Sequence, residues 1–142
     1  MPAAAGAGPP AEAGRDRTAR DRTGRGSLVL ALDVADLDAA CATARLLSEW
    51  FGLVKVGLEL FAAAGPDAVR RLRDDGFAVF VDLKLHDIPT TVGRAARSLG
   101  RMGAAYATFH AAGGVEMLRA GVEGLRAGAA EGSAAGTGAA EG

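Results

Sequence analysis

The sequence has little of several features that define whole classes of protein. Its 142 residues include one cysteine, Cys41, which excludes an intrachain disulfide and a cysteine-based metal cluster. Cys41 falls on an apolar helical face, so we expect it in the core. Sixteen basic and 17 acidic side chains give a net charge of -1, without the basic excess that is typical of a nucleic-acid-binding domain. No stretch approaches the ~18 consecutive apolar residues of a membrane span.

Both ends of the chain lack large apolar side chains. Residues 1–26 and 127–142 contain no Val, Ile, Leu, Phe, Tyr or Trp, so we expect an N-terminal disordered tail and a C-terminal low-complexity Ala/Gly tail. The arginine-rich run within the first tail is interrupted by aspartates, which favours a solvated segment over a polyanion-binding arm. The N-terminus also lacks the apolar region of a secretory signal, which favours a cytoplasmic protein. Residues 27–126 remain to fold.

Short apolar runs alternate with amphipathic helical patterns four times in this foldable region. The expected strands cover residues 28–33, 53–57, 77–83 and 106–110. Four helices are expected between and after these strands. The first begins at the Asp36 cap and has an apolar face that reaches Phe51, and the second runs from Pro66 to Gly76. The third runs from about Pro89 through Leu99, and the fourth has apolar residues from Val115 to Leu125. This alternation predicts an α/β fold with a parallel sheet covered by helices. Two architectures fit, a doubly wound sheet and a piece of a (β/α)8 barrel, and periodicity does not separate them.

Ionisable residues stand near the carboxyl ends of the first three expected strands. They are Asp33 on the first strand, Lys55 on the second, Asp82 and Lys84 on the third, and Asp87 just beyond it. Asp82 and Lys84 are two residues apart, so on a strand they point to the same side. In such folds ligands bind at the carboxyl ends of the strands. Because buried charges are tolerated when they are paired, the pattern predicts an alternating acid-base array at that end of the sheet.

Each of these residues also has a structural interpretation. Asp33 could cap a helix or form a turn. Lys55 is harder to explain in that way, because lysine is rarely buried. Asp82, Lys84 and Asp87 could form an ion-pair network without a ligand. Taken together, charged strand ends that converge on one edge favour a functional site.

Three motifs in this order resemble bacterial orotidine 5'-phosphate decarboxylases. They are ALD at Ala31–Asp33, KVGLELF at Lys55–Phe61 and VDLKLHDIPTT at Val81–Thr91. The HAAGG turn at His110–Gly114 extends the resemblance over nearly the whole foldable region. Sugar-phosphate decarboxylases with the same DxKxxD strand use Mg²⁺ and carry an acidic residue in place of Lys55, so Lys55 and the HDIP sequence favour the orotidylate enzymes.

The resemblance implies a (β/α)8 barrel that works as a homodimer and needs neither metal nor organic cofactor. The implied reaction converts orotidine 5'-monophosphate to UMP and carbon dioxide, in de novo pyrimidine biosynthesis. By the same resemblance Lys84 donates the proton to C6 of the pyrimidine, and Asp82 sits against the substrate carboxylate. Lys55 and Lys84 complete an alternating charge network, and Asp33 binds the ribose hydroxyls.

The resemblance also implies contacts across a dimer interface and a larger fold. Asp87 would reach the neighbouring site together with Ile88 and Thr91, while Thr90 stands where many relatives have Asn. The Gln and Arg that bind phosphate in the family have no counterpart here, and a barrel needs about 200 to 250 residues. We therefore expect a truncated decarboxylase with little activity alone. The alternative is a non-catalytic half-barrel that self-associates or pairs with another chain.

Overall fold

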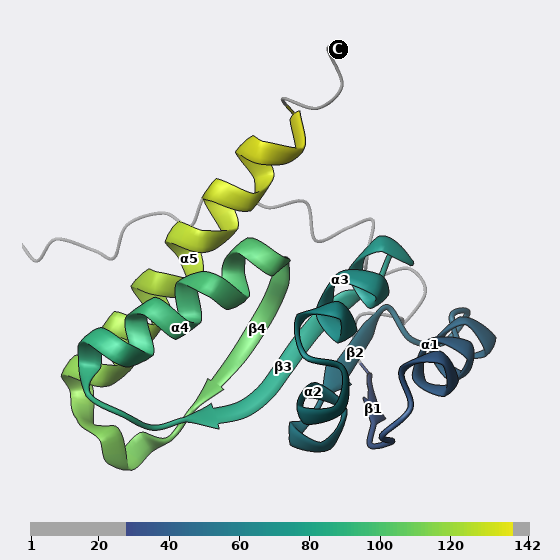
Figure 1. Ribbon diagram of the computed structural model, residues 1–142, viewed down its shortest axis with the longest axis horizontal. Helices are drawn as coiled ribbons and strands as arrows, with labels where there is room; N and C mark the ends of the chain where they lie inside the picture. The colour runs from purple at the N-terminus through teal and green to yellow at the C-terminus, as the bar shows by residue number, and fades with distance from the viewer. Residues whose placement is uncertain (1–27, 138–142) are drawn as a thin grey trace, which may run out of the picture.

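A computed structural model describes residues 28–137 as four parallel strands, each followed by helical structure (Figure 1). The elements are β1 (Val29–Leu32), α1 (Leu37–Leu46), β2 (Leu53–Val56), α2 (Leu58–Ala64), α3 (Pro66–Asp74), β3 (Ala78–Leu85), α4 (Pro89–Met102), β4 (Ala104–Phe109), a 3-10 turn (Ala111–Gly113) and α5 (Gly114–Thr137). The strand order is β1-β2-β3-β4, so every strand pairs with the one before it in the chain. Such an order is that of successive units of a (β/α)8 barrel, whereas a doubly wound sheet reverses its order at a switch point. The predicted α/β barrel class is confirmed.

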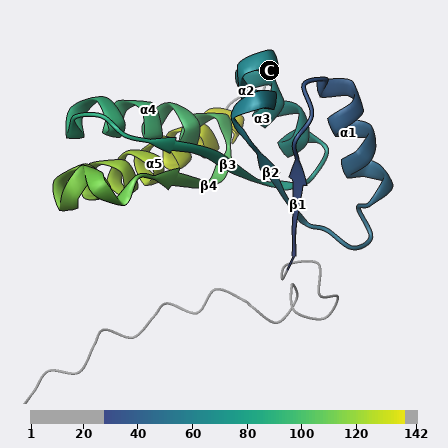
Figure 2. The same cartoon turned by 90° about the horizontal axis from the view of Figure 1, so that it is seen from below.

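The two faces of the sheet differ because side chains alternate along each strand. Val54 and Val56 of β2 and Val79 and Val81 of β3 are fully buried against the helices. Helices α1, α2, α3 and α4 gather on this face, and α5 lies beside α4 (Figure 2). The main hydrophobic core therefore lies between one face of the sheet and the helices.

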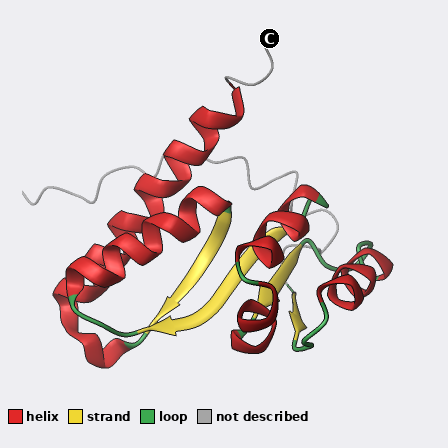
Figure 3. Cartoon of the chain, in the orientation of Figure 1, coloured by secondary structure: helices red, strands yellow, loops and turns green. Residues whose placement is uncertain are grey.

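Local sequence explains where the helices begin. The Asp36 side chain accepts a hydrogen bond from the backbone N of Ala39 at 2.6 Å and so caps α1. Pro66 occupies the first turn of α3, where its missing N–H costs nothing. Cys41 of α1 and Leu72 of α3 are fully buried, which confirms the expected position of the cysteine. The alternation of strand and helix is visible in Figure 3.

Several element boundaries differ from those expected. Helix α1 ends at Leu46, and the residues up to Trp50 form turns instead of continuing the helix to Phe51. An additional helix, α2, precedes α3, and the two meet at Gly65, whose φ of +58° suits glycine. Strand β4 begins at Ala104, two residues before the expected start. Periodicity identifies an apolar face but marks the ends of elements poorly.

Helix α5 continues to Thr137, past Arg126, where the foldable region was expected to end. The physical reason is twofold. Alanine has the highest helix propensity, and glycine lets two helices approach closely without side chains. A Cβ placed on Gly100 of α4 would lie only 2.7 Å from the backbone N of Ala129. Arg97 of α4 also forms an ion pair with Glu131 of α5. The expected N-terminal tail, residues 1–26, and the last five residues lie outside the described part of the chain.

The opposite face of the sheet carries no helix within residues 28–137. Tyr106 of β4 is 55% exposed and Val29 of β1 is 44% exposed, although both are large apolar side chains in strands. Phe80 and Tyr106 touch edge to face across this surface, with ring centroids 6.3 Å apart. In a closed barrel this face is the packed interior.

No helix among residues 28–137 is long and apolar enough to cross a membrane.

Candidate active site

Four charged residues meet at the carboxyl ends of the first three strands. Asp33 directly follows β1, Lys55 is the third residue of β2, and Asp82 and Lys84 lie in the second half of β3. In the sheet register, Lys55 stands beside Ala31 of β1 and Phe80 of β3. This register brings the predicted acid and base residues from three separate segments to one edge of the sheet.

The four side chains form a continuous chain of alternating charge. The Lys55 Nζ lies 3.4 Å from Asp33 Oδ1 and 3.5 Å from Asp82 Oδ2. The Lys84 Nζ lies 2.9 Å from Asp82 Oδ1 and donates a hydrogen bond to it. Gly57 leaves the room that this arrangement needs, because a Cβ there would stand 3.1 Å from Asp33 Oδ1. The expected array of Asp33, Lys55, Asp82 and Lys84 is therefore present as a connected network.

Asp82 is the centre of the network and its least exposed carboxylate. Its side chain is 16% exposed, against 65% for Asp33. The pKa of Asp82 lies below its ordinary value, chiefly because Lys84 hydrogen-bonds to the charged form, while burial acts in the opposite direction. The Thr108 hydroxyl and the positive charges of Lys84 and Lys55 lower the pKa of Asp82 further. Asp82 is thus held as a carboxylate at neutral pH.

Lys84 leaves the regular strand conformation. Its φ is +52°, which makes it the one non-glycine residue with positive φ in the described part of the chain. The pairing of β3 with β4 shifts register between Val81 and Leu85, and the Lys84 N–H donates instead to Thr108 Oγ1 at 2.8 Å. With a side chain that is 60% exposed, Lys84 presents an ammonium group at the open end of the sheet.

The remaining residues predicted for the site do not join this network. Asp87 is exposed, and its Oδ1 accepts a hydrogen bond from the backbone N of Ile88 at 2.6 Å. Ile88 is 65% exposed before α4, and Thr90 and Thr91 are exposed in the first turn of that helix. None of them shares a hydrogen bond or ion pair with the four network residues. Their proposed role across a dimer interface stays a prediction.

Sequence reasoning missed the contribution of Thr108 to the network and the stacked rings of His86 and His110. Thr108 of β4 donates a hydrogen bond from its hydroxyl to Asp82 Oδ1 at 2.9 Å. The rings of His86 and His110 stack at the same edge, with centroids 4.7 Å apart. Thr108 stands two residues after Tyr106 in β4, and so on the same open face of the sheet. A polar residue on the open face of the fourth strand was the signal that could have identified it.

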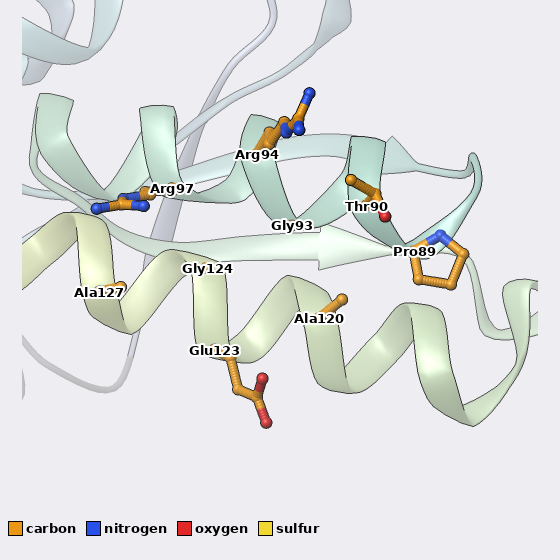
Figure 4. A pocket seen from close by; sticks show the side chains of 9 residues that line it. All are labelled: Pro89, Thr90, Gly93, Arg94, Arg97, Ala120, Glu123, Gly124 and Ala127. Atoms are coloured by element: carbon orange, nitrogen blue, oxygen red, sulfur yellow. The ribbon is translucent and has the colours of Figure 1, made fainter.

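A shallow groove between α4 and α5 lies outside this network (Figure 4). It is lined by Pro89, Thr90, Gly93, Arg94, Arg97, Ala120, Glu123, Gly124 and Ala127. None of the four network residues lines it. Among residues 28–137, no group of three or more His, Cys, Asp or Glu side chains is arranged to hold a metal ion.

Consecutive parallel βα units with an acid-base array at the strand ends define a protein of the (β/α)8-barrel class whose ligand site lies at the carboxyl ends of the strands. Residues 26–135 match the sequence profile of the orotidine 5'-phosphate decarboxylase / HUMPS family. This match covers well over half of the chain, and the chain belongs to that family.

Individual relatives agree with this assignment. The chain is 53% identical over 93 residues to orotidine 5'-phosphate decarboxylase of Moorella thermoacetica, an alignment that covers 66% of this chain and 37% of the relative. It is 59% identical over 92 residues to that of Anaeromyxobacter dehalogenans, covering 65% and 40% of the two chains.

The similarity extends to solved structures. Orotidine 5'-phosphate decarboxylase from Pyrococcus horikoshii superposes with a TM-score of 0.65 at 34% identity, covering 67% of this chain and 46% of that one. The enzyme from Lactobacillus acidophilus gives a TM-score of 0.61 at 38% identity, covering 71% and 46%. This chain therefore spans less than half the length of these relatives.

Proposed function

We propose that this chain supplies the charged half of an active site that decarboxylates orotidine 5'-monophosphate to UMP. The observation that carries the proposal is the contact between Lys84 Nζ and Asp82 Oδ1 at 2.9 Å, at the open edge where barrel enzymes bind their ligands. Family membership supplies the substrate class, because the named relatives are orotidine 5'-phosphate decarboxylases.

The reaction breaks the bond between C6 of the pyrimidine and the carboxylate carbon. The electron pair of that bond stays on C6, and the carboxylate leaves as carbon dioxide. A fixed ammonium group lowers the barrier where negative charge develops, and in this proposal Lys84 supplies that ammonium. Lys84 then gives one proton to C6, forming UMP, and recovers a proton from water.

The other network residues hold this arrangement and bind the rest of the substrate. Asp82, a carboxylate at neutral pH, is the counter-ion of Lys84 and would lie against the substrate carboxylate. Lys55 sits between Asp82 and Asp33, so the two carboxylates are bridged by a positive charge. The exposed Asp33 carboxylate is available to accept hydrogen bonds from ribose hydroxyls.

A second copy of the protein contributes further residues to the site in this proposal. Asp87, Ile88 and Thr91 are exposed just beyond β3, which carries Asp82 and Lys84, and share no hydrogen bond or ion pair with the network. Exposure at the edge of the site supports a role toward a neighbouring subunit. In a homodimer Asp87, Ile88 and Thr91 would reach the partner's substrate.

A chimaera tests the function. Residues 28–126 replace the matched segment of the Moorella thermoacetica enzyme, and decarboxylation of orotidine 5'-monophosphate is followed beside the parent enzyme. The proposal expects turnover within about tenfold of the parent, since the charged groups come from this chain and the remaining strands from the parent. A chimaera that folds and binds UMP but releases no carbon dioxide would contradict it.

The exposed sheet face supports a second candidate, a non-catalytic half-barrel that self-associates. Tyr106 and Val29 are exposed on a face without helices, and β1 and β4 are open edges among the described residues. Open edges and apolar faces favour association. Both candidates expect the 142-residue chain to sediment as a dimer or larger assembly, so turnover of the chimaera distinguishes them. The non-catalytic candidate expects a chimaera that folds but releases no carbon dioxide.

A further inference from the structure

The backbone at Lys84 requires an explanation that the charge network does not provide. A non-glycine residue with φ of +52° is sterically unfavourable, and such a conformation persists only where its surroundings hold it. An ion pair with Asp82 does not need this conformation, because side chains two residues apart on a regular strand already share a face. Some other contact must therefore hold the backbone of Lys84.

Thr108 makes that contact. Its Oγ1 accepts a hydrogen bond from the backbone N of Lys84 at 2.8 Å. The same hydroxyl donates its one proton to Asp82 Oδ1 at 2.9 Å. The two bonds fix both partners of the Asp82–Lys84 pair to β4, at the place where the regular pairing of β3 with β4 is interrupted. Pairing resumes beyond it, where the backbone N of His110 donates to the Leu85 carbonyl at 3.0 Å.

We propose that Thr108 is a positioning residue, whose hydroxyl holds Lys84 in its left-handed conformation and Asp82 in its orientation. The catalytic importance of this positioning rests on the proposed function, whereas the contact itself does not. Thr108 acts through its two partners and needs no contact with substrate. Its β-branched side chain has few rotamers, so the hydroxyl is already directed before any ligand binds.

The chemistry of the side chain makes the inference specific. The hydroxyl must accept from an N–H and donate to a carboxylate at the same time, which a threonine or serine can do and a valine cannot. Thr108→Val keeps the shape and removes both bonds. Thr108→Ser keeps both bonds and removes a methyl group. A matched control is Thr43→Val, because the Thr43 hydroxyl only donates to the Ala39 carbonyl within α1.

The test is an NMR titration of the Asp82 carboxyl carbon in the 142-residue chain and these three variants. Lys84 and Lys55 are the cations that pair with Asp82, and Asp33 is the carboxylate that shares Lys55 with it; all three are unchanged in every variant. Thr108→Val is expected to raise the pKa of Asp82, because the charged form loses a hydrogen bond. The coupling constant that reports φ of Lys84 should move toward the extended value. Thr108→Ser and Thr43→Val should leave both readings as in the wild type.

Each outcome decides the inference. An unchanged Asp82 titration in Thr108→Val overturns it, and so does a serine variant that behaves like valine. Should Thr108→Val fail to fold, hydrogen exchange of the Lys84 amide in the wild-type chain decides instead: slow exchange supports the bond to Thr108, and exchange at the rate of an open amide overturns it. Neither the titration nor the hydrogen-exchange measurement uses substrate. A titration shift together with an inactive chimaera would keep the positioning role and reject the proposed function.

Discussion

Replacing Asp82 with asparagine removes the charge that holds two lysines at one place. The asparagine oxygen can still accept from the Thr108 hydroxyl, so the substitution isolates the carboxylate charge. Two ion pairs disappear, with N to O distances of 2.9 Å to Lys84 and 3.5 Å to Lys55. The two ammonium groups then face each other without a counter-ion between them.

The size of the effect follows from distance and exposure. A pair at about 3.5 Å has a gross attraction of about 5 kcal/mol at an effective dielectric constant of about 20. Side-chain exposure of 60% at Lys84 screens its pair strongly, whereas Lys55 and Asp82 are 22% and 16% exposed. The free energy that it costs to remove these charged groups from water on folding offsets part of the attraction. We therefore expect Asp82→Asn to lower the free energy of unfolding by about 1 to 3 kcal/mol at pH 7.

The contribution of Asp82 to stability depends on pH. The folded pKa of Asp82 lies below its unfolded value, so the carboxylate stabilises the fold fully above the unfolded pKa of about 3.9. This contribution is lost as the pH falls through the folded pKa. Urea unfolding of both proteins should show a constant difference above about pH 5 that disappears in stronger acid.

A matched control separates this effect from any loss of a surface carboxylate. Asp67→Asn removes the exposed partner of Arg70 on α3 and should change the unfolding free energy far less. Equal stability of Asp82→Asn and the wild type at pH 7 would refute the reasoning. The same holds for a difference that persists unchanged at low pH.

Two further substitutions test the packing. Leu72→Ala should lower the free energy of unfolding by about 3 kcal/mol in urea titrations, because removing a fully buried side chain leaves a cavity. The control Leu46→Ala, at a position that is 77% exposed, should change the free energy of unfolding little. Similar values for the two variants would contradict the assigned core. Gly100→Ala should lower Tm and the hydrogen-exchange protection of α5, because the added Cβ would stand 2.7 Å from the backbone N of Ala129. An unchanged Tm would show that α4 and α5 do not pack this closely.

The sequence predicted the fold class and the charged network for clear physical reasons. Strands that are apolar along their length and alternate with amphipathic helices have few arrangements available. Charged residues at strand ends of a parallel sheet share one edge, so Asp33, Lys55, Asp82 and Lys84 were expected together and are found together. The apolar pattern does not contain the strand order, so the choice of a barrel over a doubly wound sheet came from the motifs that resemble orotidine 5'-phosphate decarboxylases.

The missed features depend on contacts between segments far apart in the chain. Thr108 can be recognised as a partner of Asp82 and Lys84 only when the register of β4 against β3 is known. The length of α5 depends on glycines that fit against the backbone of α4, and a search for large apolar side chains overlooks such packing. Sequence patterns report local preference, whereas these features arise from tertiary approach.

Lys84→Ala in the chimaera tests whether Lys84 supplies the ammonium and the proton for decarboxylation. The measurement is kcat for carbon dioxide release from orotidine 5'-monophosphate, with Lys55→Ala and UMP binding measured beside it. We expect Lys84→Ala to lower kcat by at least ~10³-fold in a chimaera that still folds and binds UMP. Turnover within about tenfold of the unsubstituted chimaera would contradict it.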